Sequence, residues 1–91
     1  MYFVYILECS DGTYYTGFTN NITRRVKAHN NGRGARYTKG RLPVTLRYVE
    51  VFKSRRDALR READIKTMSH SQKSQLIESC PPPPALEMLE C

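Results

Sequence analysis

The chain lacks the features that mark a membrane-bound or disulfide-linked protein. No apolar run reaches the length of about 18 residues that a membrane span needs, and no charged segment precedes an apolar one at the N-terminus. We therefore expect neither a membrane span nor a signal peptide. Cys9, Cys80 and Cys91 are odd in number, widely spaced and include no CxxC pair. This pattern argues against a disulfide framework and a structural zinc site, and fits a cytoplasmic protein in which Cys9 is a small buried residue.

Acidic residues are scarce where basic residues are dense. The whole chain has nine Asp and Glu against fifteen Lys and Arg, a net charge of +6. Residues 19–56 hold one acid, Glu50, and eleven bases, which are Arg24, Arg25, Lys27, Arg33, Arg36, Lys39, Arg41, Arg47, Lys53, Arg55 and Arg56. The local excess of ten positive charges (11 − 1) predicts a polyanionic partner. The alternative is a solvated basic surface that only keeps a small protein soluble.

The length of 91 residues predicts a single domain with one modest core. Near the C-terminus, Pro81 to Pro84 form an uninterrupted run that ends any helix and favours an extended segment. We therefore expect a domain over residues 1–79 and a proline-rich tail over residues 80–91. The tail is expected to be disordered or to dock elsewhere, for example on a protein partner.

Two tyrosine-bearing apolar runs predict a β-hairpin whose loop length has a functional consequence. Residues 2–8 are continuously apolar enough to form a strand buried on both faces, and residues 13–18 form its partner. A three-residue loop over residues 10–12, with Gly12 in the left-handed region, would put Tyr5 and Tyr15 on one face of the sheet. A two-residue turn would put them on opposite faces. We predict the three-residue loop.

Helix and strand signals continue along the chain. Asn20 or Asn21 caps a helix that runs to about His29, in which Ile22, Val26 and His29 share one stripe with Arg25 on its edge. The predicted elements that follow are a Gly- and base-rich loop over residues 33–41, a strand over residues 44–52, a helix from Ser54 to about Met68, and a short helix from Ser69 to about Glu78. The order ββαβαα predicts an α+β fold, with a three-stranded antiparallel sheet covered by helices.

Glu62 lies out of place in the second long helix. It is near the centre of the apolar sector formed with Ala58, Leu59 and Ile65, whereas Arg60, Arg61 and Asp64 are predicted to face away. A buried, unpaired carboxylate costs several kcal/mol, so Glu62 needs a partner. The alternatives are a salt bridge to an arginine at the edge of the core, a metal ion, or a catalytic site open to water.

Together, these residues resemble the GIY-YIG nuclease superfamily, in particular its small stand-alone bacterial members related to the nuclease module of the excision-repair incision subunit. The resemblance covers about residues 2–77. It rests on Phe3-Val4-Tyr5, Tyr15-Thr16-Gly17, Arg25 with His29, Gly34-Ala35-Arg36-Tyr37-Thr38, Leu42-Pro43-Val44 and Glu62. Two positions depart from the family pattern. Phe3 replaces the first glycine, and residues 72–75 hold no asparagine where many members have one.

The resemblance implies a metal-dependent endonuclease that hydrolyses phosphodiester bonds in DNA, and it connects the protein with DNA repair. Selection of particular DNA structures and action on RNA both stay open. Glu62 would hold Mg²⁺ or Mn²⁺, and Arg25 would stabilise charge in the transition state. Tyr15 would orient or deprotonate the attacking water with Tyr5 beside it, His29 would tune a tyrosine or accept a proton, and Gly17 would let the backbone approach the site. The expected nucleic-acid contacts are Arg24, Lys27, Arg33, Arg36, Tyr37, Lys39 and Arg41.

Two other functions stay open at this point. A nucleic-acid-binding module with little or no turnover would explain the basic segment and the absent asparagine. An interaction adaptor would work through the proline-rich tail. Tyr37 also has two interpretations, because it either stacks on an unpaired base or braces its own loop.

Overall fold

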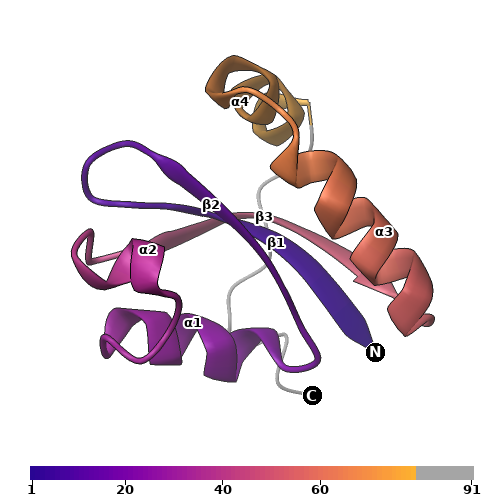
Figure 1. The fold of residues 1–91 in the computed structure, drawn as a ribbon, viewed down its shortest axis with the longest axis horizontal. Coiled ribbons are helices and arrows are strands. Elements are labelled where there is room, and N and C mark those ends of the chain that lie inside the picture. Colours follow the sequence, from indigo (N-terminus) through magenta and orange to yellow (C-terminus); the bar gives the residue numbers. More distant parts are fainter. Residues whose placement is uncertain (80–91) are drawn as a thin grey trace.

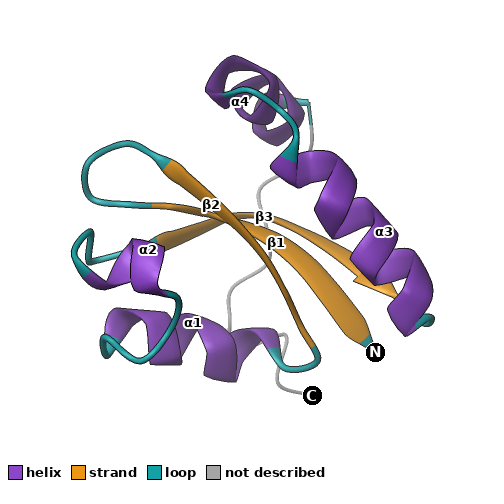
Figure 2. Cartoon of the chain, viewed as in Figure 1, coloured by secondary structure: helices purple, strands orange, loops and turns teal. Residues whose placement is uncertain are grey.

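The computed structural model describes residues 1–79, which form a three-stranded antiparallel sheet between two groups of helices (Figures 1 and 2). The predicted tail over residues 80–91 lies outside the described residues. The elements are β1 (Tyr2–Glu8), β2 (Tyr14–Thr19), α1 (Ile22–Asn30), α2 (Arg36–Lys39), β3 (Thr45–Phe52), α3 (Arg55–Lys66) and α4 (His70–Glu78). The predicted α+β architecture and element order are confirmed. The short helix α2 is an addition, since it lies within the segment that we predicted as a loop.

The strand order is β2-β1-β3, which makes β1 the central strand and β2 a free edge. Val4, Tyr5, Ile6 and Leu7 are all buried, as a strand covered on both faces requires. On one face Tyr5 and Leu7 pack with Ile22 and Val26 of α1. On the other face Val4 and Ile6 pack with Ala58 and Ile65 of α3. The sheet therefore separates α1 and α2 from α3 and α4 (Figure 1).

The hairpin loop between β1 and β2 has the predicted length. The amide of Cys9 donates to the carbonyl of Thr13, and Leu7 lies opposite Tyr15. Gly12 has a φ of +82°, the left-handed conformation that glycine adopts readily. Cys9 is a buried free thiol, as expected. The three-residue loop over residues 10–12 is confirmed.

Side-chain caps fix where the helices begin. The side chains of Asn21, Ser54 and Ser69 accept backbone hydrogen bonds at the starts of α1, α3 and α4, respectively. Ser69 and Gln72 complete a reciprocal capping box. Among the residues that the structure describes, no helix combines the length and the hydropathy that a membrane crossing demands.

Candidate active site

Tyr5 and Tyr15 lie on the same face of the sheet, and their ring centroids are 6.5 Å apart. In the register set by the hairpin loop, Gly17 lies directly opposite Tyr5. A Cβ atom at residue 17 would lie 2.4 Å from the Tyr5 hydroxyl oxygen, a distance that van der Waals radii forbid. Gly17 is therefore the residue that leaves room for the Tyr5 phenol.

Helix α1 brings Arg25 and His29 to the two tyrosines. Its apolar stripe packs on the sheet, which points the edge of the helix at Tyr5. The Arg25 guanidinium lies close enough to the hydroxyls of Tyr5 and Tyr15 that both raise its pKa, while His29, one turn later, is fully buried. His29 Nε2 lies 3.1 Å from the Tyr5 hydroxyl oxygen. Four of the predicted site residues therefore meet in one cluster.

The second nitrogen of His29 is held by the segment before and within α2. Nδ1 lies 2.8 Å from the Thr38 hydroxyl and accepts a hydrogen bond from the Ala35 amide at 3.3 Å. The Thr38 hydroxyl also donates to the Ala35 carbonyl at 3.0 Å, so both ring nitrogens of His29 are engaged within the protein, Nδ1 by this segment and Nε2 by Tyr5. A Cβ at residue 34 would lie 2.1 Å from Nδ1, so Gly34 also makes room for this site.

Burial controls the charge state of Tyr5 and His29. It raises the pKa of Tyr5 to about 12, outweighing the opposing hydrogen bond from Arg25, and the nearby Tyr15 and Glu62 also disfavour the phenolate. Burial, with Arg25 adding to it, lowers the pKa of His29 to about 4. Both side chains are therefore neutral at neutral pH.

Glu62 reaches the same region from α3, on the opposite side of the sheet. Its side chain is 17% exposed, and its carboxylate lies 3.3 Å from the ammonium of Lys66, one turn further along the helix. The partner is thus a lysine and not an arginine. Glu62 lies close enough to Tyr5 to affect the pKa of the phenol. The Glu62 carboxylate is therefore near Tyr5, paired with Lys66 and still partly open to water.

The prediction that Arg61 faces away from the core was wrong. The Arg61 guanidinium donates to the carboxylate of Glu50 on β3 at 2.8 Å, and both side chains are partly buried. The long side chain of Arg61 reaches a partner on the sheet that helical periodicity alone does not reveal. Asp64 is exposed, as predicted.

A pocket of about 190 Å³ lies beside the cluster, at the free edge of β2. It is lined by Tyr14, Tyr15, Thr16, Tyr37, Lys66 and Lys73. Consecutive strand residues point to opposite faces, so a pocket that contacts three of them must wrap around the strand edge. The Thr16 hydroxyl is buried and has no hydrogen-bond partner within residues 1–79. Sequence reasoning did not identify Lys66, Lys73, Gly34 or Thr38 as site residues.

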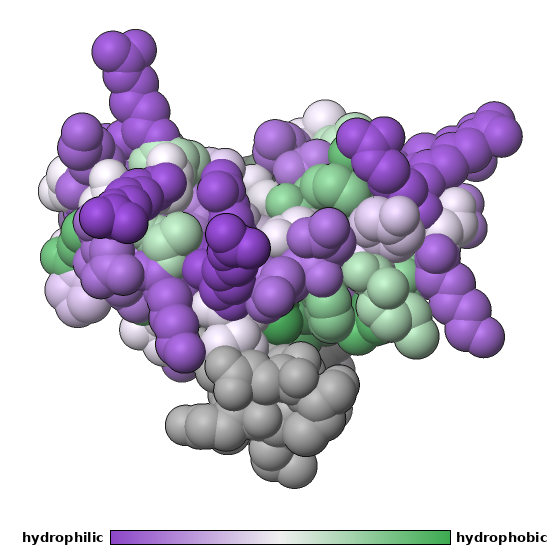
Figure 3. Space-filling model, turned by 90° about the horizontal axis from the view of Figure 1, so that it is seen from below, coloured by the Kyte–Doolittle hydropathy of each residue, from purple (hydrophilic) through white to green (hydrophobic). Residues whose placement is uncertain are grey.

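The predicted nucleic-acid contacts fall on the α1 and α2 side of the molecule. Arg24, Lys27 and Arg33 line an open groove of about 860 Å³ along α1, and Arg36 and Lys39 are exposed on α2. Figure 3, a view from below Figure 1, shows long hydrophilic side chains projecting from the protein, with small hydrophobic patches between them. These five bases therefore form a solvent-accessible basic surface.

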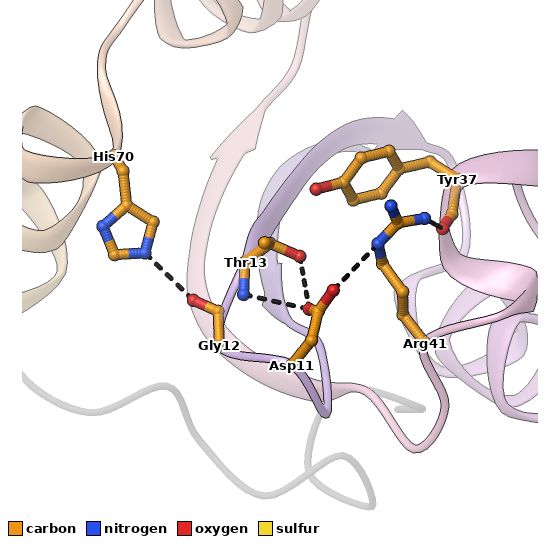
Figure 4. A network of polar contacts seen from close by, with 6 residues as sticks. All are labelled: Asp11, Gly12, Thr13, Tyr37, Arg41 and His70. Carbon is orange, nitrogen blue, oxygen red and sulfur yellow. Dashed lines mark hydrogen bonds and ion pairs between the residues drawn. The ribbon is translucent and has the colours of Figure 1, made fainter.

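Arg41 and Tyr37 instead make contacts within the protein (Figure 4). The Arg41 guanidinium lies 3.0 Å from the Asp11 carboxylate, donates to the Tyr37 carbonyl at 2.7 Å, and sits 4.1 Å from the centroid of the Tyr37 ring. Tyr37 also stacks on Tyr15, with ring centroids 6.1 Å apart. This geometry favours the bracing interpretation of Tyr37.

On the other side of the hairpin tip, His70 Nε2 lies 2.9 Å from the Gly12 carbonyl, and the His70 ring stacks on Tyr14. Helix α4 is thereby attached to the hairpin next to the pocket. The tip of the β1–β2 hairpin is thus held from both sides, by Arg41 and by His70 (Figure 4).

The donor atoms suit a magnesium-like ion better than zinc. Within residues 1–79 no group of three His, Cys, Asp or Glu side chains is close enough together to hold a metal. Mg²⁺ is commonly bound by one or two carboxylates, with water and substrate phosphate oxygens completing its octahedral shell. Glu62, a single carboxylate that is partly open to water, fits this one-carboxylate arrangement.

Two tyrosines on neighbouring strands, a helix arginine and a glutamate from the helix on the far face of the sheet thus lie near one another on an α+β domain. A family profile described as the GIY-YIG catalytic domain matches residues 1–75. The chain belongs to the GIY-YIG family, a family of nucleases that are typically metal-dependent.

Proteins similar to this chain come from distant organisms. A UPF0213 protein of Halobacterium salinarum is 58% identical over 76 residues, which are 84% of this chain and 99% of that protein. A UPF0213 protein of Clostridium perfringens is 56% identical over 79 residues, which are 87% and 85% of the two chains. These names specify no activity.

Two solution NMR structures have a similar fold. A UPF0213 protein of Bacillus halodurans is 46% identical with a TM-score of 0.56, over 86% of this chain and 84% of that one. A protein of E. faecalis is 36% identical with a TM-score of 0.59, over 86% and 83% of the two chains.

Proposed function

We propose that this protein is an endonuclease that hydrolyses phosphodiester bonds in DNA with the help of a divalent cation, Mg²⁺ or Mn²⁺. The observation that carries the proposal is the convergence of Tyr5, Tyr15 and Arg25, with the Glu62 carboxylate of α3 close enough to Tyr5 to influence its pKa. A basic surface lies along α1, the helix that carries Arg25, and suits a phosphate backbone.

Each side chain has a role that its surroundings support. Arg25 lies beside two phenol hydroxyls, and its charge would stabilise a phosphate that gains negative charge in the transition state. Tyr15, which lines the pocket, would orient or deprotonate the attacking water. Tyr5 has a pKa of about 12, so it acts as a neutral hydrogen-bonding group and not as the base.

His29 acts through Tyr5. It is fully buried, it shares a hydrogen bond with the Tyr5 hydroxyl, and it is neutral at neutral pH. We therefore assign it as a positioning residue. Gly17 and Gly34 serve the same arrangement by leaving space next to the two rings.

Glu62 would hold the cation. The cation, when bound, supplies Lewis-acid stabilisation of the phosphate and the leaving oxygen. At the carboxylate oxygen that pairs with Lys66, the cation would compete with the ammonium.

Binding to DNA would depend mainly on phosphate contacts from Arg24, Lys27, Arg33, Arg36 and Lys39. Arg41 is left out of this set because its guanidinium is engaged with Asp11 and Tyr37. Phosphate contacts carry no sequence information, so affinity should fall steeply with salt and depend little on sequence.

The test is a cleavage assay on supercoiled plasmid, single-stranded DNA, branched DNA and RNA, with Mg²⁺ or Mn²⁺ and with chelator. Glu62→Gln and Arg25→Ala should each reduce the rate by about 10²–10³-fold, the usual cost of removing one preorganised electrostatic group. Asp64→Asn is the matched control, because it removes an exposed carboxylate from the same helix. Cleavage at the parental rate by both site variants would refute the assignment.

A second candidate function is nucleic-acid binding without turnover. It is favoured by the Lys66–Glu62 ion pair, which already occupies the carboxylate that a metal would need, and by the absence of asparagine from residues 72–75. Salt-sensitive binding of every substrate, with no cleavage under any metal condition, would select this function over the first.

A further inference from the structure

Two lysines outside the predicted set line the pocket at the β2 edge. Lys66 comes from the last turn of α3 and Lys73 from α4, and both contribute to the pocket that Tyr15 also lines. A volume of about 190 Å³ is below the roughly 300–1,000 Å³ of typical small-molecule sites. The pocket therefore suits one compact group, such as a phosphate, rather than a whole metabolite.

The charges of this pocket favour an anion. Partial burial, with the nearby Lys66 ammonium adding to it, lowers the pKa of Lys73. Within residues 1–79, the one carboxylate that forms an ion pair with either lysine is Glu62, which pairs with Lys66. Lys73 thus holds a partly desolvated positive charge without a carboxylate partner in the described residues. A phosphate oxygen would supply that partner.

The position of the pocket points to a phosphate on a nucleic-acid strand. Tyr15 connects the pocket to Arg25, because the Arg25 guanidinium hydrogen bonds to the Tyr15 hydroxyl while the Tyr15 ring lines the pocket. A strand that places one phosphate at Arg25, and continues around the free edge of β2, reaches the lysines on the other side of the sheet. The basic surface of α1 and α2 lies on the Arg25 side, so the lysines extend the charged track to the α3 and α4 side (Figure 1).

The attachment of α4 supports a built site rather than a chance approach of two side chains. His70, in the first turn of α4, stacks on Tyr14 with ring centroids 4.4 Å apart and contacts the Gly12 carbonyl (Figure 4). Tyr14 itself lines the pocket. The helix that carries Lys73 is therefore attached to the strand that forms the pocket wall.

We propose that Lys66 and Lys73 form a second phosphate-binding site for the nucleic-acid strand, separate from the basic surface of α1 and α2. This inference rests on the proposed function for the identity of the strand. Lys73 is the main contact, and Lys66 joins it when the Glu62 carboxylate takes up a cation and releases the lysine.

The test is the salt dependence of DNA binding, measured with a fluorescent oligonucleotide in chelator so that no cleavage occurs. Each phosphate contact contributes about 0.9 to the slope of log K against log salt for a duplex and about 0.7 for a single strand. Lys73→Met keeps the length and the aliphatic packing of the side chain. It should reduce the slope by about one such contact, and Lys73→Arg should keep the parental slope.

Lys53→Met is the matched control, because Lys53 is an exposed lysine in the turn before α3 and lies outside the pocket. Its slope should equal that of the parent. The inference is overturned if Lys73→Met and Lys53→Met change the slope equally, or if Lys73→Met does not change it at all. Thermal unfolding of each variant shows whether a reduced salt slope is caused by loss of folding. A parental slope in Lys73→Arg would show that the positive charge at residue 73 is what the slope depends on.

A competition arm identifies the source of the phosphate. Inorganic phosphate, titrated at constant ionic strength, should displace the oligonucleotide only weakly, because the strand is held at many phosphates. Displacement at low phosphate concentration would show a site for a free anion and overturn the assignment to a strand. Since no turnover is measured, these outcomes are independent of whether the protein cuts DNA.

Discussion

The hydroxyl oxygen of Tyr5 lies 3.1 Å from Nε2 of His29, in a place where neither ring is in contact with bulk water. The rest of the site depends on this pair, because Arg25 and Gly17 both contact the same hydroxyl. The position of Tyr5 on the central strand determines where its phenol lies, and the helical periodicity of α1 determines where the imidazole of His29 lies. Their meeting point is fixed by the packing of α1 on the sheet.

Replacement of His29 should remove a pH dependence of stability. The ordinary pKa of 6.5 falls to about 4 in the folded protein, so between these values the unfolded chain binds a proton that the folded protein does not. The free energy of unfolding therefore falls as the pH drops from 6.5 to 4, by about 3 kcal/mol for this shift. Denaturant unfolding across this range should show the fall in the parent and its absence in His29→Gln.

His70→Gln is the control for that experiment: it removes the other histidine, which stacks on Tyr14 and contacts the Gly12 carbonyl, and it leaves the Tyr5 contact intact. Loss of these contacts should lower its free energy of unfolding at every pH, while the fall between pH 6.5 and 4 should persist. An identical fall in His29→Gln would mean that carboxylates, and not this imidazole, cause the acid sensitivity.

Alanine at residue 17 or 34 should disturb the site from opposite sides. The added Cβ would lie 2.4 Å from the Tyr5 hydroxyl in Gly17→Ala and 2.1 Å from His29 Nδ1 in Gly34→Ala, so a ring or the backbone must move. Overpacking of this kind costs about 1–3 kcal/mol, and the displaced phenol should also reduce cleavage. Gly40→Ala is the control, because its Cβ would meet nothing within 4 Å. Equal melting temperatures and rates in all three variants would contradict the geometry.

The two tyrosines should differ in how they affect the pH profile of cleavage. Because the pKa of Tyr5 is about 12, the phenol stays protonated throughout the usual assay range and contributes no ionisation there. Tyr5→Phe should therefore lower the rate without changing the shape of the pH–rate profile. The opposite result is that the alkaline limb of the pH–rate profile disappears in Tyr5→Phe and persists in Tyr15→Phe. That result would mean that the roles proposed for the two tyrosines must be exchanged.

How far the sequence predicts this site depends on whether local patterns or tertiary packing decide a feature. The hairpin loop follows from the Ser10-Asp11-Gly12 turn, and the caps of the helices follow from Asn21, Ser54 and Ser69. These features were predicted because each is fixed by residues adjacent in the chain. The contact of Arg61 with Glu50 was missed, because it depends on how far a long side chain reaches across to another element.

The role of α2 and α4 was also beyond sequence reasoning. Thr38 has no periodic signal that marks it as a partner of His29, and it contacts Nδ1 only because the segment after α1 folds back. Lys66 was detectable in principle, since it lies four residues after Glu62 on the same helix. Lys73 was not, because its place in the pocket depends on the packing of α4 against β2 through His70 and Tyr14.

Arg41 should prove to be a brace and not a phosphate contact. Arg41→Gln removes the guanidinium that joins Asp11 to the carbonyl and ring of Tyr37, so the melting temperature should fall while the salt slope of DNA binding stays unchanged. Arg36→Gln should do the opposite, because Arg36 is exposed on α2. A double-mutant cycle with Asp11→Asn should show a weak coupling, as expected for an exposed ion pair. A slope reduced in Arg41→Gln would return this residue to the binding surface.

Lys66 should compete with the metal for Glu62. The Lys66 ammonium lies 3.3 Å from one carboxylate oxygen of Glu62, so a cation that binds this oxygen competes with the lysine. Lys66→Met removes that competitor and leaves Glu62 unpaired, which should tighten Mn²⁺ binding, measured by calorimetry without nucleic acid. Glu62→Gln should abolish the same heat of binding.

The Lys66 side chain is about half exposed, so the gain in Mn²⁺ affinity should be modest, between about threefold and tenfold, equivalent to roughly 0.6–1.4 kcal/mol. Lys53→Met, which changes the net charge equally but lies away from Glu62, corrects for the general effect of removing one positive charge. Equal tightening in Lys66→Met and Lys53→Met would show that Lys66 does not guard the carboxylate.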